Sequence, residues 1–292
     1  MVPFLRGPPP PDLWEKLDKS TLPEFLRNYV RVEAPEHDAE DDMDLEWPSF
    51  GGHGTLEALE VSRVLEENGI VCAFCGVSAL IYYGAGRVRD DWDICVPSDQ
   101  VEKAVAIFKS EERSNDYFPV PSQPIPIPGS LRHTYHRFRV RNLYFHFNIV
   151  PADDIHLELA PDKIQRSRHG LPYPKLHVLI QSFLDTKDMV SLADVVDGSD
   201  VTDEWGQEHL NLEGETDIEW AAWKNKRIVA CTSTIMGGGV PSRPFKKRDL
   251  WNDVVSTKLG RCGWKRPHSL FKTRFRLIGS IDPWLEPDRN CS

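Results

Sequence analysis

The stretch Val71–Val96 (VCAFCGVSALIYYGAGRVRDDWDICV) constrains the fold more than any other part of the chain. The apolar run Ile70–Phe74 predicts a short buried strand. Gly76 interrupts that run, Ser78–Tyr83 can form a short helix, and Trp92–Val96 predicts a second strand. We therefore expect a strand–helix–strand unit inside an α+β protein.

Two carboxylates begin the second predicted strand. Asp91 and Asp93 are two residues apart, so the strand period of two places both on one face. Like charges repel, and each costs free energy to desolvate. A Mg²⁺ ion between them relieves both effects, because it prefers hard oxygen ligands. Repulsion also predicts that replacing either aspartate with asparagine leaves stability unchanged or slightly higher.

The turn from the first strand into the helix offers groups for an anion. Gly76 and Ser78 lie at this turn and would present backbone N–H groups and a hydroxyl. The sequence therefore predicts a phosphate site beside the acidic pair.

The whole pattern resembles that of the nucleotidyltransferase superfamily, which has the polymerase-β-like fold. The family pattern is Gly-Gly-x-Ala, a second Gly, then Arg-x-Thr-x-Asp-x-Asp. Here it corresponds to Gly76–Ala79, Gly84 and Arg87–Asp93 at matching spacing. Val77 replaces the usual second Gly, and Arg89 replaces the usual Thr or Ser. In overall style the chain is also similar to uncharacterised fungal proteins that carry this motif.

The resemblance implies a nucleotidyltransferase-like core, a mixed sheet flanked by helices. The sequence of the second half adds the expectation of a mostly helical and basic C-terminal part. It implies an enzyme that holds NTP–Mg²⁺ at Asp91 and Asp93, the metal ligands and catalytic residues. Gly76, Ser78 and Arg87 would hold the triphosphate. A small-molecule or RNA acceptor would then attack the α-phosphorus in line.

The third carboxylate of the family comes from a later strand, and here that position is occupied by Asn148. An amide brings no charge, so the affinity for Mg²⁺ is expected to fall. His146 shares a strand face with Asn148 and is a further candidate catalytic residue. Three acids beyond the strand are possible substitutes for the missing carboxylate: Asp153, Asp154 and Glu158.

Two other functions remain open. The same fold could transfer an aminoacyl group from tRNA and form peptide bonds, as in fungal arginine-containing cyclodipeptide synthases. Alternatively, the chain could be a non-catalytic nucleotide- or RNA-binding protein. Binding of metal and nucleotide separates the first function from these two, and binding of tRNA separates them from each other.

Three regions are expected. Residues 1–50 are a Pro-rich and acidic extension, residues 51–160 the nucleotidyltransferase-like core, and residues 161–292 a helical and basic region. Periodicity and capping signals predict the remaining elements. These are helices at Leu56–Asn68, after Ser98 as N-cap, and at Lys175–Thr186, strands at His133–Val140 and Asn142–Val150, and a loop at Pro119–Pro128.

The end of the chain carries a net positive charge, although the chain as a whole has a net charge of −10. From Ser242 to Ser292, basic residues outnumber acidic ones by twelve to five, and aromatic residues lie between them. Such a stretch suits phosphates and stacked bases, which makes a nucleotide or tRNA a candidate partner. The alternative is a basic face that the acidic remainder of the chain neutralises.

The bulk properties exclude several classes. No apolar run is long enough for a transmembrane helix, and the N-terminus lacks the apolar core of a signal peptide, so no membrane contact and a cytoplasmic location are expected. The six cysteines are scattered, which predicts free thiols rather than disulfides or a zinc site.

Overall fold

The computed structural model describes residues 45–85, 87–123, 127–231 and 238–258. All of them belong to one compact unit. The predictions made for residues 1–44 and for the basic, aromatic stretch 259–292 lie outside the described residues.

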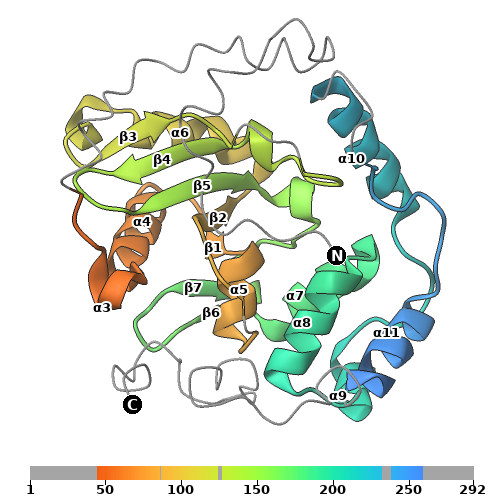
Figure 1. The fold of residues 1–292 in the computed structure, drawn as a ribbon. Coiled ribbons are helices and arrows are strands. Elements are labelled where there is room, and N and C mark those ends of the chain that lie inside the picture. Colours follow the sequence, from red (N-terminus) through yellow and green to blue (C-terminus); the bar gives the residue numbers. More distant parts are fainter. Residues whose placement is uncertain (1–44, 86, 124–126, 232–237, 259–292) are drawn as a thin grey trace, which may run out of the picture. The chain divides into compact units, whose positions relative to one another are not determined.

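Within the described residues, the larger sheet has five strands in the order β1-β2-β5-β4-β3 (Figure 1). Strands β2 and β5 are parallel, and each of the other neighbouring pairs is antiparallel. The predicted mixed sheet flanked by helices is therefore confirmed. The strands are β1 (Ala73–Phe74), β2 (Trp92–Val96), β3 (Tyr117–Val120), β4 (His136–Val140) and β5 (His146–Pro151).

Helices precede, interrupt and follow this sheet (Figure 1). The first group consists of α3 (Ser49–Gly52), α4 (Thr55–Glu67), α5 (Gly76–Tyr82) and α6 (Val101–Phe108). A second sheet pairs β6 (Ile164–Arg166) with β7 (Pro172–Pro174). The second group of helices bears out the mostly helical C-terminal part: α7 (Leu176–Thr186), α8 (Met189–Ser199), α9 (Asp203–His209), α10 (Ile218–Cys231) and α11 (Lys247–Ser256). Single 3₁₀ turns are η2 (Ser98–Gln100), η3 (Glu111–Arg113), η4 (Arg132–Thr134), η5 (Ala152–Ile155) and η6 (Pro161–Lys163).

The core lies between the sheet and its helices. Helix α6 shows why the sequence folds this way, because its apolar residues recur at helical spacing and Phe108 is fully buried. The Phe108 ring contacts Phe147 of β5 and Phe138 of β4, with centroid distances of 5.0 and 5.5 Å. This aromatic cluster fixes one face of β4 and β5 against α6. The polar residues that alternate with it are thereby directed to the other face.

Several local predictions need correction. Strand β1 has only two residues, shorter than the predicted Ile70–Phe74. Ser98 does not cap α6, because its hydroxyl instead accepts a hydrogen bond from the backbone N–H of Asp153 at 2.9 Å. Pro119 lies in strand β3 rather than in a loop, at the outer edge of the sheet where its missing N–H is tolerated. Strands β6 and β7 were not predicted, since three residues are too few to show a period.

Helix α8 lies directly against the turn that leads to the acidic pair. A Cβ atom added at Gly198 would lie 2.6 Å from the backbone nitrogen of Ala85. Gly198→Ala is therefore expected to lower the free energy of unfolding by about 2 kcal/mol, because the backbone would have to shift. Gly214→Ala is the control: it has open space and costs about 1 kcal/mol through its positive φ alone. If urea denaturation showed equal losses of unfolding free energy for Gly198→Ala and Gly214→Ala, the close contact between Gly198 and Ala85 would be contradicted.

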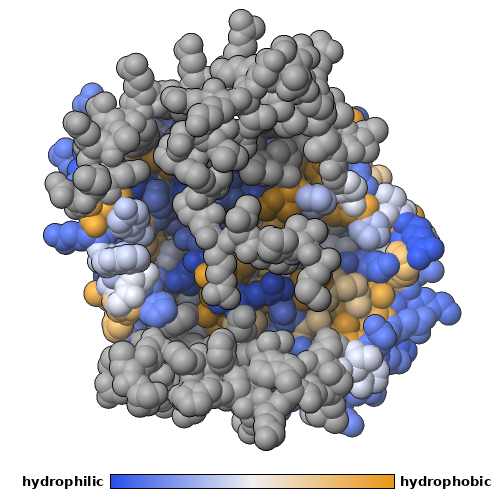
Figure 2. Space-filling view, in the orientation of Figure 1, coloured by the Kyte–Doolittle hydropathy of each residue, from blue (hydrophilic) through white to orange (hydrophobic). Residues whose placement is uncertain are grey.

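The described surface mixes polar and apolar residues, which are interleaved on the face shown in Figure 2. Large exposed hydrophobic side chains include Trp47 and Val88, and Val88 lies between two arginines of the motif. None of the helices in the described ranges is long and apolar enough to cross a membrane.

Candidate functional site

The two aspartates of the motif lie together in the structure. Asp93 is on β2, and Asp91 precedes that strand by one residue. Asp91 is buried, whereas the Asp93 side chain is 16% exposed. The Asn148 amide nitrogen donates to both carboxylates, at 2.8 Å to Asp93 Oδ1 and 3.3 Å to Asp91 Oδ2. Asn148 therefore holds the acidic pair together as a hydrogen-bond donor.

Strand register explains this contact and adds a residue that sequence analysis missed. Asp93 is opposite Asn148 across the β2–β5 pair, and Asn148 is opposite Arg137 across the β5–β4 pair. The three side chains thus form one row across the sheet. Arg137 binds Asp91 with two parallel hydrogen bonds, from Nε to Oδ2 and from Nη2 to Oδ1, both at 3.0 Å. Such a bidentate pair is strong and specific in its geometry.

A second arginine, Arg132 of η4, also lies at the pair. Its Nη2 is 3.6 Å from Asp91 Oδ2 and 3.7 Å from Asp93 Oδ1. Gln123 adds a hydrogen bond to Asp91 at 3.3 Å. Two guanidinium groups thus neutralise two carboxylates. In β4, arginines alternate with apolar residues, which indicated that Arg137 lies on the polar face of a strand. The pattern could not indicate which strand would pair with β4.

The two carboxyl groups have opposite pKa shifts. Burial raises the pKa of Asp91, but the hydrogen bonds and the charge of Arg137, helped by Asn148, outweigh it, and the net pKa is lowered. Burial also acts on Asp93, and there it prevails: the pKa is raised although Arg132 and Asn148 lower it. Asp91 is therefore the firmly ionised member of the pair.

The predicted phosphate-binding turn borders the pair. Gly76 begins α5 with φ of +54°, and a Cβ atom added there would lie 3.2 Å from Asp93 Oδ2. A side chain at this position would therefore crowd the carboxylate. Ser78 is 2% exposed, and its hydroxyl has no hydrogen-bond partner among the described residues. Ser78 thus carries an unused buried donor one helical turn or less from Gly76.

Of the other predicted site residues, His146 lies near the acidic pair and Arg87 does not. His146 begins β5, two residues before Asn148, and its charge contributes to the low pKa of Asp91. Arg87 lies against Asp194 of α8, with its Nε 2.5 Å from Asp194 Oδ2, rather than at the acidic pair. Arg89 donates to the His53 carbonyl oxygen at 2.7 Å, and its guanidinium lies 3.5 Å from the centre of the Trp92 ring. Burial lowers the pKa of Arg89 to about 10.

Two of the three possible substitutes for the third acid pair with cations elsewhere in the chain. The Asp154 carboxylate pairs with Arg227 of α10, and Glu158 pairs with Lys163 at 3.5 Å. The backbone oxygen of Asp153 accepts a hydrogen bond from the Trp220 indole at 2.6 Å. In the part of the chain that the structure describes, no three His, Cys, Asp or Glu side chains gather as a metal site.

The donor set nevertheless fits a Mg²⁺ ion that a substrate helps to bind. Such ions are usually held by one or two protein carboxylates together with phosphate oxygens and water. A carboxylate has about four lone-pair sites. Arg137, Asn148 and Gln123 each donate to Asp91 Oδ2, whereas Asp91 Oδ1 accepts from Arg137, and within the described ranges no hydrogen bond reaches Asp93 Oδ2. Asp93 and one oxygen of Asp91 would hold the ion.

The described cations of the basic stretch are largely paired within the chain. Lys247 is buried and lies 3.1 Å from Asp185, Arg248 lies 2.6 Å from Glu213, and Lys258 lies 2.6 Å from Asp200. For these three residues, neutralisation by acids of the same chain agrees with the structure. Most of the other cations counted there lie beyond residue 258, outside the described residues.

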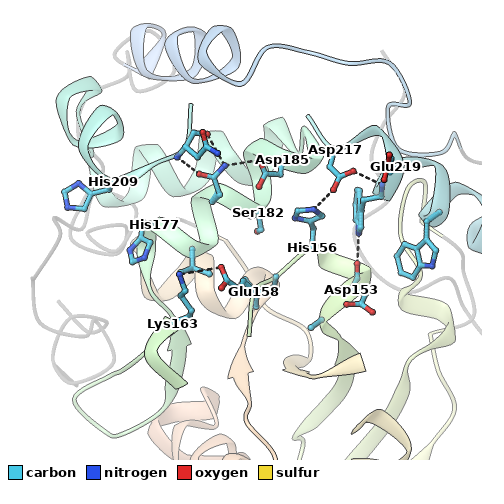
Figure 3. Close-up of a pocket in the computed structure, with 17 residues that line it drawn as sticks. Asp153, His156, Glu158, Lys163, His177, Ser182, Asp185, His209, Asp217 and Glu219 are labelled. Atoms are coloured by element: carbon cyan, nitrogen blue, oxygen red, sulfur yellow. Dashed lines mark hydrogen bonds and ion pairs between the residues drawn. The ribbon is translucent and has the colours of Figure 1, made fainter. Parts of the chain in front are cut away.

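A cavity of about 760 Å³ lies away from the motif, lined by residues of η5, α7 and the start of α10 (Figure 3). Its lining includes neither aspartate of the pair nor Asn148. His156, with φ of 52°, places its Nε2 3.0 Å from Asp217 Oδ2, which ties η5 to α10. Three acids that line the cavity are paired within the protein: Asp217 with His156, Glu158 with Lys163, and Asp185 with Lys247. The motif residues therefore remain the candidate site.

Comparison with known proteins gives little further information. No protein-family model matches the chain, and no curated protein matches it. Among solved structures, it is similar to a crystal structure of ANT(2″)-Ia in complex with adenylyl-2″-tobramycin. The two share 12% sequence identity over 60% of this chain and 99% of that one, with a TM-score of 0.32. So low a TM-score does not establish a common fold, and the function has to be inferred from this chain's own residues.

Proposed function

We propose that the protein transfers a nucleotidyl group from an NTP–Mg²⁺ complex to a small-molecule or RNA acceptor. One observation supports this most directly. Two acidic side chains of the motif, Asp91 and Asp93, meet beside Gly76 and are held in one place by Asn148. A partly buried acidic pair that is fixed by other side chains is typical of a functional site.

The residues of the site would divide the work. Asp91 and Asp93 hold the metal-bound end of the donor, and the ion, when bound, neutralises charge on the phosphate oxygens during in-line displacement. Ser78 donates its unused hydroxyl to a phosphate oxygen. Gly76 leaves room for the phosphates beside Asp93. Arg137 keeps Asp91 ionised and correctly oriented, because its two hydrogen bonds fix both carboxylate oxygens.

The first test of this function is binding and turnover by the full chain. In the presence of MgCl₂, at least one of the four NTPs is expected to raise the melting temperature, because a ligand that binds only the folded state stabilises it. Release of pyrophosphate with a hydroxyl- or amine-bearing acceptor, followed by mass spectrometry, is expected to require Mg²⁺ and to be lost in Asp93→Asn. If bulk tRNA raises the melting temperature and no NTP does, the proposal is wrong and tRNA-dependent transfer replaces it.

A further inference from the structure

The structure assigns different roles to the two arginines at the acidic pair. We propose that Arg132 is the ligand of the donor's phosphates, and that it leaves the carboxylates when metal and phosphate bind together. This inference rests on the proposed function for the identity of the donor. The underlying chemistry is a polyphosphate–Mg²⁺ complex, which can be tested without nucleotide or acceptor.

Arg132 is held more loosely than Arg137. Arg137 makes two hydrogen bonds of 3.0 Å to Asp91, whereas Arg132 approaches the carboxylates only to 3.6 and 3.7 Å. Those distances are longer than charged N–H···O hydrogen bonds. The Arg132 Nε is moreover buried and has no hydrogen-bond partner among the described residues. Since a buried donor without a partner is unfavourable, phosphate oxygens at this position would satisfy it.

The backbone around Arg132 is nevertheless fixed. Leu131 is fully buried, and its carbonyl oxygen accepts the Thr134 hydroxyl at 2.7 Å. The Ser130 hydroxyl accepts the Arg132 backbone N–H at 3.1 Å. The turn thus presents the guanidinium at the site while the side chain keeps the freedom to change partner. A planar guanidinium suits two phosphate oxygens.

Charge balance links the phosphate to the metal. Asp91 and Asp93 are neutralised by Arg132 and Arg137, so a Mg²⁺ ion alone would leave the site with an excess of positive charge. A polyphosphate anion removes that excess by taking over Arg132. Metal and phosphate should therefore bind cooperatively, each raising the affinity for the other by the same factor. Either ligand alone should bind weakly.

The test compares binding of MgCl₂ alone, of inorganic tripolyphosphate alone, and of both together, by titration calorimetry on the full chain. For Arg132→Gln we expect about tenfold weaker binding of tripolyphosphate with Mg²⁺, since a charge-assisted hydrogen bond is lost. The same variant should bind Mg²⁺ alone more tightly, because a competing positive charge is gone. Arg63→Gln, an exposed arginine 3.9 Å from Glu60, is the matched control and should change neither affinity.

These opposite shifts separate a phosphate ligand from a structural residue. If Arg132→Gln changes neither affinity, or weakens both, the assignment is overturned. The melting temperature of Arg132→Gln shows whether the variant is folded. Arg132→Lys keeps the charge without the planar donors, so its affinity for tripolyphosphate with Mg²⁺ should lie between those of wild type and Arg132→Gln. The proposed function can fail separately. If binding of tripolyphosphate depends on Arg132 but no NTP is turned over, this site binds polyphosphate and the proposed nucleotidyl transfer is wrong.

Discussion

Asp91→Asn is expected to lower the free energy of unfolding by about 3 kcal/mol, because it leaves the partly buried guanidinium of Arg137 without its carboxylate. This reverses the expectation from the sequence, where repulsion between the aspartates predicted no loss. The repulsion on which that expectation depended is offset at Asp91, since Arg132 and Arg137 neutralise the pair. Urea denaturation of wild type and variant measures the change.

Asp93→Asn is the matched comparison, with the same substitution two residues away. Burial raises the pKa of Asp93, so its ionised form is disfavoured in the folded state. Its replacement should therefore leave stability unchanged or slightly higher, while nucleotidyl transfer is lost in both variants. If Asp91→Asn is no less stable than Asp93→Asn, the Arg137 guanidinium does not need the Asp91 carboxylate as its partner, and this prediction is wrong. A double variant, Asp91→Asn with Arg137→Gln, should recover most of the loss.

The two aspartates should also differ in their pH dependence. The folded-state pKa of Asp91 lies below its ordinary value of 3.8, so its contribution is present above pH 3.8 and is lost as the pH falls through the lowered pKa. The pKa of Asp93 lies above 3.8, so stability falls as the pH rises from 3.8 through the raised pKa. The stability difference between Asp93→Asn and wild type should therefore grow over that second interval and then level off.

Asn148→Asp is expected to lower the free energy of unfolding by about 3 kcal/mol in EDTA. The substitution removes a donor that serves two carboxylates and adds a third buried negative charge. Mg²⁺ or Mn²⁺ should restore most of this loss, because an ion that binds only the folded state stabilises it by mass action. Wild type should respond less to metal alone, since its two carboxylates are already neutralised by arginines.

The measurement is the melting temperature of both proteins in EDTA and in metal. Asn115→Asp, at an exposed position, is the control for added charge and should behave like wild type. A wild-type response as large as that of Asn148→Asp would mean that another residue already completes a metal site. If neither protein responds, three carboxylates at this place do not bind metal without phosphate, and the expectation for Asn148→Asp is wrong.

Local patterns predicted the elements around the site well. Strand β2 is found where predicted, and α4, α5 and α7 agree with the sequence within two residues. These elements are defined by apolar residues that recur within one or two turns, so their signal is contained in a short window. The same is true of Asp91 and Asp93, whose meeting follows from the strand period alone.

The partners of these aspartates could not be predicted in the same way. Arg137 reaches Asp91 across 46 positions of sequence, and only the pairing of β4 with β5 places it in the row of Asn148. A shift of one residue in that register would direct Arg137 to the opposite face. For Arg87 the sequence predicted a place beside the acidic pair. The packing of α8 instead brings Asp194 to it, which the local sequence could not show.

The sequence by itself therefore predicted that two carboxylates, a glycine turn and an amide lie close together, as the structure has them. Only the tertiary structure decided that two arginines neutralise the carboxylates and that Asn148 donates to both of them. The physical reason is that alternation along a strand is a local property, whereas the charge around a buried group depends on which distant strands pack beside it and in which register.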